Sequence, residues 1–415
     1  MTAFHRQAGS LMSEQVALSS LAEAHGTPLY VYSRSAIEQA WKEFADALQS
    51  RPHLICYAVK ANSNLAILDT LVRLGSGFDI VSGGELKRVL AAGGQPGKIV
   101  FSGVGKGEGE MAAALEAGIR CFNVESDSEL SRLAEVAAAH GVIAPVSLRI
   151  NPDVDARTHP YISTGLKENK FGIGMDDAMA SYRRGAELAS LDIRGIDCHI
   201  GSQLTQLEPY ADAVRLLIDM VDRLSAEGIA LSHIDVGGGQ GISYQQSDES
   251  LDIAGWARCI MAAIGDRKLE IIVEPGRYVV GQAGVLLTRV EYLKSNADRH
   301  FAVVDAAMND LLRPALYSAW QAIEPVETLP REARMYDVVG PVCESADFLG
   351  KQRNLSIAEK DLLCIRSSGA YAFAMSSNYN TRARAAEVMV DGGESFLVRA
   401  REDIDSLFAN EFLLP

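Results

Sequence analysis

The sequence predicts an α/β protein, a (β/α)8 barrel followed by a C-terminal β-rich domain, and three observations lead to this prediction. Between residues 54 and 277, eight short apolar strand-like runs alternate with helical patterns. The alternation covers roughly 220 residues, a length typical of such a barrel. After residue 277 the composition changes to β-like runs joined by turns.

Each of the eight predicted strands is an apolar run that ends on a polar residue or a glycine. Strands that alternate with helices form right-handed βαβ units and a parallel sheet. A doubly wound sheet has the same alternation, but polar ends at every unit favour a barrel, whose active site lies at the carboxyl ends of its strands. The runs are LICYAVK, GFDIVS, KIVFSG, RCFNVES, VSLRINP, IRGIDCHIGS, HIDVGGG and LEIIVEPGR.

Amphipathic stretches such as NLAILDTLVRLG and SELSRLAEVAAAHG lie between the runs, and most of them end on glycine, a common helix C-terminal signal. We expect the barrel at 30–277 and the β domain at 278–415, joined by residues 1–29. In the second domain, EVMVDGGESFLVRA is typical of a hairpin that turns at Asp391-Gly392-Gly393.

Composition limits the partners and the compartment. The chain has 415 residues and a formal charge of −15, which argues against nucleic acid and anionic membrane surfaces as partners. No apolar run approaches the roughly 20 residues of a membrane span, and the N-terminus lacks the apolar stretch of a secretory signal. The six cysteines form no CxxC pair, so we expect no metal site and a reducing, cytoplasmic setting.

Lys60 ends the first predicted strand, where a buried lysine is costly. A surface or ion-paired lysine would account for it. The other interpretation is a Schiff-base lysine, whose pKa is lowered by partial burial and nearby cations so that it can attack a carbonyl group. The position of Lys60 at the mouth of a predicted barrel favours the second interpretation.

Two further strand ends carry residues that suit an anionic cofactor. The glycines Gly237, Gly238 and Gly239 follow the seventh strand, where barrels often bind phosphate, although a tight turn would also use them. In the EPGR motif, Glu274 and Arg277 pair with each other or, alternatively, bind a ring nitrogen and an anion.

His199, in CHIGSQ, follows another apolar strand. A lone histidine there is more often a core residue, but beside the other groups it could stack on a planar ring. A Schiff-base lysine, a phosphate loop, a partner for a ring nitrogen and a stacking imidazole together predict a pyridoxal 5'-phosphate (PLP) site.

At this point several motifs resemble those of the diaminopimelate decarboxylase family, PLP enzymes whose fold is an alanine-racemase-like barrel with a C-terminal β domain. The resemblance runs from about residue 26 to residue 405, in the order of the family. It implies decarboxylation of meso-2,6-diaminopimelate to L-lysine and CO2, the last step of bacterial lysine synthesis. The motifs are YAVKANSN, GFDIVSGGEL, HPYISTGLKENKFGI, CHIGSQ, DVGGGQGISY, EPGR, GPVCESAD and SSGAYAFAMSSNYNTR.

The resemblance also implies roles for single residues. In the cofactor site, Lys60 holds PLP covalently, His199 stacks on its ring and Glu274 pairs with its ring nitrogen. The remaining implied cofactor-binding residues contact the phosphate or belong to the EPGR motif; they are Ser202, Gly237, Gly238, Gly239, Gly276, Arg277 and Tyr371.

For the substrate, the same resemblance implies a set of arginines and tyrosines that hold carboxylates, with an acidic residue for the distal amine. Cys343 is the implied proton donor and, with Glu344, reaches the site from the partner subunit of a homodimer with shared active sites. The implied substrate-binding residues are Arg277, Arg313, Tyr317, Glu344 and Tyr371.

An alternative is a related decarboxylase that acts on a basic amino acid or on carboxynorspermidine. The motifs around Lys60, His199 and EPGR are shared with such enzymes and do not discriminate. RPALY and CESAD do discriminate, because a diamine-type enzyme would offer an acidic residue to the distal amine where this chain offers Arg313.

Overall fold

The computed structural model describes residues 3–154, 169–245, 247–297 and 299–415. The chain divides into two compact units. The first comprises residues 40–242 and 249–278, and the second comprises residues 1–39, 243–248 and 279–415.

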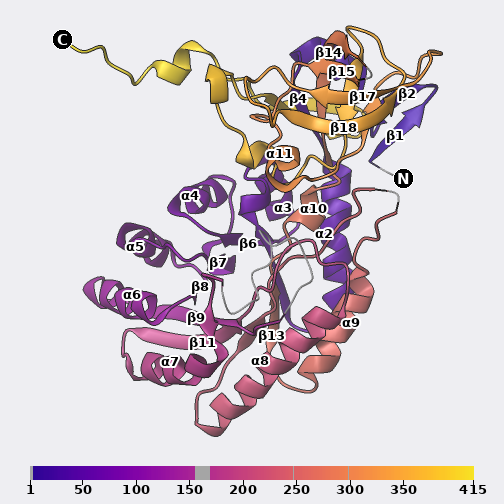
Figure 1. Ribbon diagram of the computed structural model, residues 1–415. Helices are drawn as coiled ribbons and strands as arrows, with labels where there is room; N and C mark the ends of the chain where they lie inside the picture. The colour runs from indigo at the N-terminus through magenta and orange to yellow at the C-terminus, as the bar shows by residue number, and fades with distance from the viewer. Residues whose placement is uncertain (1–2, 155–168, 246, 298) are drawn as a thin grey trace. The chain divides into compact units, whose positions relative to one another are not determined.

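The first unit is a closed barrel of eight parallel strands (Figure 1). Each strand pairs with the next along the chain, and the ring closes where the first strand pairs with the last. The predicted barrel is therefore confirmed, and all eight predicted runs contribute a strand. The strands are β5 (His53–Ala58), β6 (Gly77–Ile80), β7 (Ile99–Phe101), β8 (Cys121–Val124), β9 (Ala144–Asn151), β11 (Leu191–Asp197), β12 (His233–Asp235) and β13 (Glu270–Val273), and the two-residue β10 (Ile173–Gly174) pairs with β9.

Helices cover the outside of this ring (Figure 1). Polar residues begin several of them. The side chains of Asn64, Ser82 and Ser126 each accept a hydrogen bond from a backbone N–H in the first turn, the usual N-cap arrangement. Among the described residues, no helix is both long enough and apolar enough to cross a membrane. The helices are α2 (Arg34–Leu48), α3 (Leu65–Arg73), α4 (Gly83–Ala91), α5 (Glu108–Ala117), α6 (Asp127–Ala139), α7 (Met175–Glu187), α8 (Glu208–Ala226), α9 (Ile253–Ile264) and α10 (Arg277–Val280).

The interior of the barrel is not uniformly apolar. Leu54, Cys56, Val100, Cys121 and Ile272 form a buried apolar cluster from four strands. Other buried positions on the same strands carry carboxyl, amide and hydroxyl groups. Buried polar groups need partners, and clusters of them are common at active sites. This part of the interior is therefore a candidate functional site.

The second unit is built on a mixed β-sheet with the strand order β18-β17-β15-β14-β4-β20-β21. The predicted hairpin is present, with Asp391 opposite Glu394 and Gly392 at φ 62°. The strands are β4 (Leu29–Ser33), β14 (Gly284–Asn296), β15 (Arg299–Val304), β16 (Ile323–Pro325), β17 (Arg334–Val339), β18 (Phe348–Leu355), β19 (Leu362–Ile365), β20 (Ala386–Asp391) and β21 (Glu394–Arg399).

In this sheet β4 lies between β14 and β20, with which it makes an antiparallel and a parallel pair. Residues 29–33 therefore belong to the mixed sheet, whereas the barrel was expected from residue 30. The domain limits given above remain a prediction. The pairing of β4 concerns the limit that was placed at residue 30.

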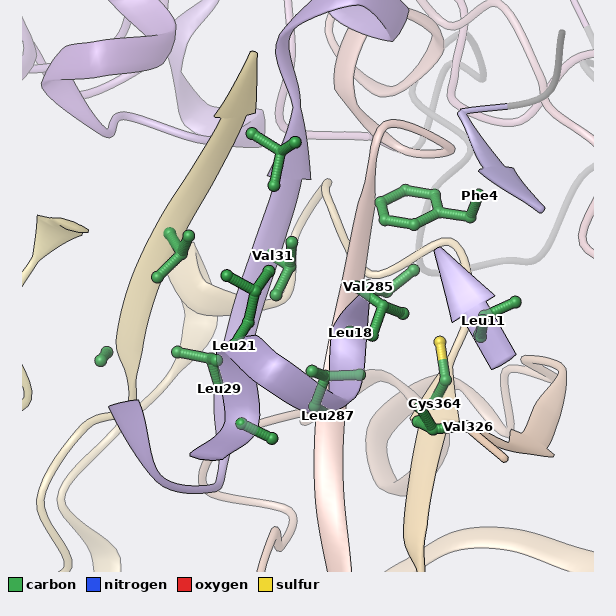
Figure 2. Close-up of a cluster of buried hydrophobic side chains, with 14 residues drawn as sticks. Phe4, Leu11, Leu18, Leu21, Leu29, Val31, Val285, Leu287, Val326 and Cys364 are labelled. Atoms are coloured by element: carbon green, nitrogen blue, oxygen red, sulfur yellow. The ribbon is translucent and has the colours of Figure 1, made fainter. Parts of the chain in front are cut away.

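The N-terminal segment and the strands of the sheet contribute to one hydrophobic core of fourteen buried residues (Figure 2). Leu18 and Leu21 of α1 (Leu18–His25) and Leu11 of β2 (Ser10–Ser13) lie in the same cluster as Val31 and Val285 of the central strands. Burial of apolar area is the main stabilising term in such a cluster. The other short elements of this unit are β1 (Phe4–Gln7), β3 (Val16–Ala17) and α11 (Arg313–Tyr317).

Candidate active site

Lys60 lies just beyond the carboxyl end of a barrel strand. β5 ends at Ala58, and Lys60 is in the middle of a single 3-10 turn, Val59–Ala61. Its Nζ donates to Asp79 Oδ2 of β6 at 2.8 Å. The Asp79 side chain is 0% exposed while that of Lys60 is 34% exposed, so the ion pair joins the barrel interior to its open end. The lysine is thus both ion-paired and accessible to a ligand at the mouth of the barrel.

Gly276 brings the EPGR motif against this turn. A Cβ on Gly276 would lie 3.0 Å from Ala58 Cβ and 3.1 Å from Ala61 Cβ. The Ala58 N–H donates to Pro275 O at 3.1 Å. The absence of a side chain at this position therefore lets the segment after β13 pack closely beside Lys60.

His199 is held by the glycine loop that follows β12. Its Nδ1 accepts a hydrogen bond from the Gly238 N–H at 3.1 Å. Burial, followed by the nearby positive charges of Arg149 and Lys60, lowers the pKa of His199 well below its usual value. The ring is therefore neutral and carries its proton on Nε2, which is the form suited to stacking on a planar ring.

The three glycines of this loop allow backbones to approach one another. A Cβ on Gly238 would lie 2.1 Å from Glu274 O, and one on Gly239 would lie 2.2 Å from Gly201 O. The Gly237 N–H donates to Asp235 Oδ1 at 2.9 Å, so this amide and that of Gly238 already serve the loop itself. The glycines are required by packing, and their predicted contact with a phosphate remains a prediction.

Arg277 and Ser202 meet at the same end of the barrel. Arg277 Nη2 donates to Ser202 Oγ at 2.9 Å, and Arg277 is only 6% exposed. A buried guanidinium beside a hydroxyl group is a suitable partner for a phosphate or carboxylate.

Glu274 is buried, with 4% of its surface exposed. Its Oε1 accepts from Ser102 Oγ at 3.3 Å and from Asn123 Nδ2 at 3.2 Å. Burial, followed by the charges of Asp235, Asp79 and Asp197 and opposed by Lys60, raises the pKa of Glu274 well above its usual value.

Two further carboxyl groups accompany Glu274. One oxygen from each of Asp197, Asp235 and Glu274 lies within 4.8 Å of the others, and all three residues are buried. A buried cluster of this kind is stable only with a cation beside it or a proton on one of its members. Arg149 Nε of β9 is 4.0 Å from Asp197 Oδ2, so one of the three already has a cation beside it.

Two of the predicted substrate residues lie on α11 of the second unit. Arg313 is 7% exposed, and its guanidinium carbon lies 4.6 Å from the centre of the Tyr244 ring. Tyr317 ends the same helix, one turn further on. An arginine fixed by stacking is well prepared to bind a planar carboxylate.

Cys343 and Glu344 lie on an exposed loop after β17. Asp347 organises this loop: its Oδ2 accepts from the Val342 N–H at 2.8 Å and its Oδ1 from the Met308 N–H at 2.7 Å. The Cys343 N–H donates to Asn380 Oδ1 at 3.0 Å. Cys343 is exposed, so it is not one of the small buried hydrophobes that free cysteines usually are.

Tyr371 has a φ of 54°, in the left-handed region that bulky residues rarely adopt. The preceding Gly369 permits the close packing of this segment, because a Cβ there would lie 1.8 Å from Val280 O. Backbone outliers of this kind concentrate at binding sites.

The sequence analysis missed several polar residues of the barrel interior. Aspartates inside otherwise apolar strands, as in GFDIVS, IDCHIGS and HIDVGGG, were the available signal. The missed residues are Asp79, Asn123, Asp197 and Asp235.

Comparison with known proteins places this geometry in a family. The model of the pyridoxal binding domain of pyridoxal-dependent decarboxylases matches residues 34–281. The diaminopimelate decarboxylase of Pseudomonas aeruginosa is 59% identical over the full length of both chains. The chain belongs to the diaminopimelate decarboxylase family.

Solved structures of this family agree with the fold. The Helicobacter pylori enzyme, complexed with L-lysine, superposes with a TM-score of 0.92 at 43% identity and covers 95% of this chain and 98% of its own. The M. jannaschii enzyme, also with L-lysine, gives a TM-score of 0.95 at 36% identity, with 100% and 98% covered. The predicted family, carboxy-lyase activity and PLP cofactor are thereby confirmed.

The residues of the barrel mouth fit this cofactor. The accessible Lys60 suits the aldehyde of PLP, and the neutral imidazole of His199 suits its ring. The buried Glu274 suits the ring nitrogen, and the pair of Arg277 and Ser202 suits the phosphate. Residues 159–168 of the HPYISTGLKENKFGI motif lie outside the described residues.

Proposed function

We propose how the residues of this chain carry out the reaction of its family. The reaction is the decarboxylation of meso-2,6-diaminopimelate to L-lysine and CO2, the final step of lysine biosynthesis. The observation that carries the proposal is the accessible Lys60 at 2.8 Å from buried Asp79, beside a neutral His199 and the buried Glu274.

Lys60 is the covalent anchor of PLP in this proposal. When bound, the cofactor accepts the electron pair left as the carboxyl group departs. Asp79 would keep the Lys60 side chain beside the bound cofactor, through the ion pair that the two residues form here. Glu274 would accept a hydrogen bond from a protonated ring nitrogen, and His199 would lie against the ring and exclude water from it.

The anion sites are divided between two groups of residues. Ser202, Gly239 and Arg277 receive the phosphate, assisted by Tyr371, and support for this comes from the hydrogen bond between Arg277 and Ser202. Arg313 holds the distal carboxylate of the substrate, with Tyr317 beside it. The stacking of Arg313 on Tyr244 supports this role, because it fixes the orientation of the guanidinium group.

Cys343 gives the proton that Cα receives after CO2 has left, and Glu344 accepts the distal amino group. Both residues are exposed on their loop. This exposure supports a homodimer in which each subunit contributes Cys343 and Glu344 to the active site of its partner. A cytoplasmic setting is part of the proposal, since all six cysteines are free thiols in the described structure.

The test is CO2 release by the purified protein with PLP from meso-diaminopimelate, L-ornithine and L-arginine in parallel. Release from diaminopimelate alone is expected. An Arg313→Met variant should lose about 100-fold in kcat/KM for diaminopimelate while it keeps its bound cofactor, because a charge-assisted bidentate contact is lost.

Two outcomes would contradict the proposal. Release from ornithine or arginine by the wild-type protein would overturn the substrate assignment. Unchanged kcat/KM in Arg313→Met would overturn the role of Arg313 as the residue that recognises the distal carboxylate.

A further inference from the structure

The carboxyl groups of Asp235 and Glu274 lie unusually close together inside the barrel. They are within hydrogen-bonding reach of each other, in a cluster whose oxygens are within 4.8 Å. Asp235 is 0% exposed and Glu274 is 4% exposed. Two ionised carboxylates can only accept hydrogen bonds, so such a contact is favourable only if a proton lies between them.

The hydrogen-bond partners of the two residues point to where this proton resides. Asp235 Oδ1 accepts from the Gly237 N–H at 2.9 Å. Asp235 Oδ2, by contrast, has no donor within the described part of the chain. Glu274 Oε1 receives two donors, from Ser102 and Asn123. Glu274 is therefore stabilised as an acceptor, while Asp235 has a buried oxygen that a proton would satisfy.

The charges around the pair do not neutralise it. Two cations face the cluster, Lys60 and Arg149, against five buried carboxyl groups, which are Asp79, Glu125, Asp197, Asp235 and Glu274. Each cation already has an acidic partner: Lys60 is 2.8 Å from Asp79, and Arg149 is 3.0 Å from Glu125 and 4.0 Å from Asp197.

The other titratable groups add no positive charge. Burial, as the largest cause, raises the pKa values of the Cys56, Cys121 and Cys198 thiols and lowers that of His199, so all four remain neutral. Lys106 forms an ion pair with Glu129, with 2.7 Å between Nζ and Oε1. Asp235 and Glu274 have no cation of their own, so negative charge is in excess at this pair. Burial and Asp235 also raise the pKa of Asp197, although Arg149 lies beside it.

We propose that Asp235 and Glu274 share one proton, which resides on Asp235 when Glu274 accepts from the ring nitrogen of the cofactor. Asp235 is then a positioning residue: as a neutral acid it donates to Glu274 and keeps that carboxylate ionised. The role toward the ring nitrogen rests on the function proposed above, whereas the shared proton itself does not.

The electrostatics support a shared proton. Burial is the largest cause that raises the pKa of Asp235 to about 7. Burial and the neighbouring Asp235 raise that of Glu274 in the same direction. Two interacting groups of this kind titrate as a pair. Without cofactor the electrostatics favour Glu274 as the holder of the proton, because the hydrogen bond from Glu274 lowers the pKa of Asp235. A protonated ring nitrogen beside Glu274 favours the ionised form of that residue, which leaves the proton on Asp235.

Infrared spectroscopy of the holoenzyme tests the shared proton. At about pH 8, where ordinary carboxyl groups are ionised, we expect the C=O stretch of a buried carboxylic acid. This band should shift when aspartate side chains are labelled with carbon-13 and stay in place when glutamate side chains are labelled. Because burial also raises the pKa of Asp197, the band is assigned in the Asp197→Asn variant, where it should be retained. It should be lost when Asp235→Asn is added to that variant.

The labelled Asp197→Asn protein tests the proposal even if the Asp235→Asn change prevents folding. The absence of a carboxylic acid band there, a band that shifts only with glutamate labelling, or a band that persists when Asp235→Asn is added would each overturn the proposal. The same spectra of the cofactor-free protein separate the shared proton from PLP binding, so a failure of the proposed function is recognised independently.

The positioning role is tested with ring-nitrogen-15-labelled PLP. In Asp235→Asn the amide Nδ2 can donate to Glu274 in place of the acid, so the protonated ring-nitrogen shift should be kept. In Asp235→Leu the donor at this position is lost and only those from Ser102 and Asn123 remain. Glu274 then becomes more basic and competes for the ring proton, and the shift should move toward the unprotonated value. Equal shifts in the wild type and Asp235→Leu would overturn this role.

Discussion

At the scale of single residues, the ion pair of Lys60 with Asp79 leads to the first prediction. Lys60→Ala should abolish the absorbance of covalently bound cofactor and lower kcat by more than about 1000-fold, since the covalent anchor is lost. The fold should remain, because the Lys60 side chain is only partly buried. Absorbance spectra, CO2 release and circular dichroism measure these three properties.

The matched control is Lys87→Ala, a change at an exposed lysine on α4 that should leave all three properties unchanged. Turnover by Lys60→Ala without any added amine would contradict the role of this residue as anchor.

His233 is a buried residue whose effect on stability depends on pH. It begins β12 with 1% of its surface exposed, and burial lowers its pKa from 6.5 to about 3. A depressed histidine pKa contributes stability that is complete above about pH 6.5 and is lost as the pH falls toward the folded-state value. Between pH 7 and pH 5 the loss should be about 2 kcal/mol.

Urea unfolding of the wild type and of His233→Gln at both pH values checks this expectation. The variant should lose less stability than the wild type on acidification, whatever its stability at neutral pH. His140→Gln, at an exposed histidine, is the control and should behave like the wild type. Equal acid losses in the wild type and His233→Gln would show that His233 is not responsible.

At the scale of elements, the loop after β12 depends on glycine for close contact between backbones. Gly238→Ala would put a Cβ at 2.1 Å from Glu274 O. Backbone atoms on both sides cannot yield easily, so we expect a loss of about 3 kcal/mol in the free energy of unfolding. Weaker PLP affinity should follow, because His199 and Glu274 both adjoin this loop.

Gly109→Ala is the matched control, since a Cβ on this glycine of α5 would meet nothing within 4 Å. It should be neutral or stabilising by about 0.5 kcal/mol. Chemical unfolding and PLP titration of both variants decide the matter, and a fully stable Gly238→Ala with normal cofactor affinity would refute the packing argument.

The loop that carries Cys343 and Glu344 depends on Asp347 for its shape. Asp347→Ala removes the acceptor for the backbone N–H groups of Val342 and Met308. Unsatisfied amides should loosen the loop, so kcat should fall about 10-fold or more while the cofactor absorbance stays normal.

Hydrogen exchange of residues 340–347 and steady-state kinetics measure the two effects. Asp403→Ala, at an exposed aspartate of the same unit, should change neither. Faster exchange in Asp347→Ala with an unchanged kcat would argue against a catalytic role for this loop.

At the scale of the whole molecule, the proposal requires shared active sites. Mixed dimers of Lys60→Ala and Cys343→Ala chains contain one site with both residues intact. Since random pairing makes half of the dimers mixed, an equal mixture should recover about one quarter of the wild-type activity. Activity assays after subunit exchange test this, and no recovery beyond the sum of the two inactive proteins would count against shared sites.

The sequence predicted much of the architecture because the barrel repeats one local pattern. Every predicted strand run is a strand of the barrel, since apolar runs between helices of similar length have few other ways to pack. The start of the barrel, which was predicted at residue 30, does not follow from such a repeated pattern. Residues 29–33 have the pattern of a buried strand, and no local signal says whether such a strand joins the barrel or the mixed sheet.

The candidate site follows the same division. Lys60, His199, Glu274 and Arg277 could be proposed from the sequence because each polar residue follows an apolar strand, and their roles stay predictions. Asp79 and Asp235 were missed because they lie within strands, where a single polar residue does not alter the pattern.

By itself, the sequence determined the barrel, the family motifs and the acidic charge, because periodicity, residue types and composition are local or additive properties. The tertiary structure alone decided that Asp79 meets Lys60, that Asp235 lies against Glu274 and that Cys343 is exposed. These facts depend on the register between strands and on loop packing, which join residues far apart in the chain through contacts that no local pattern encodes.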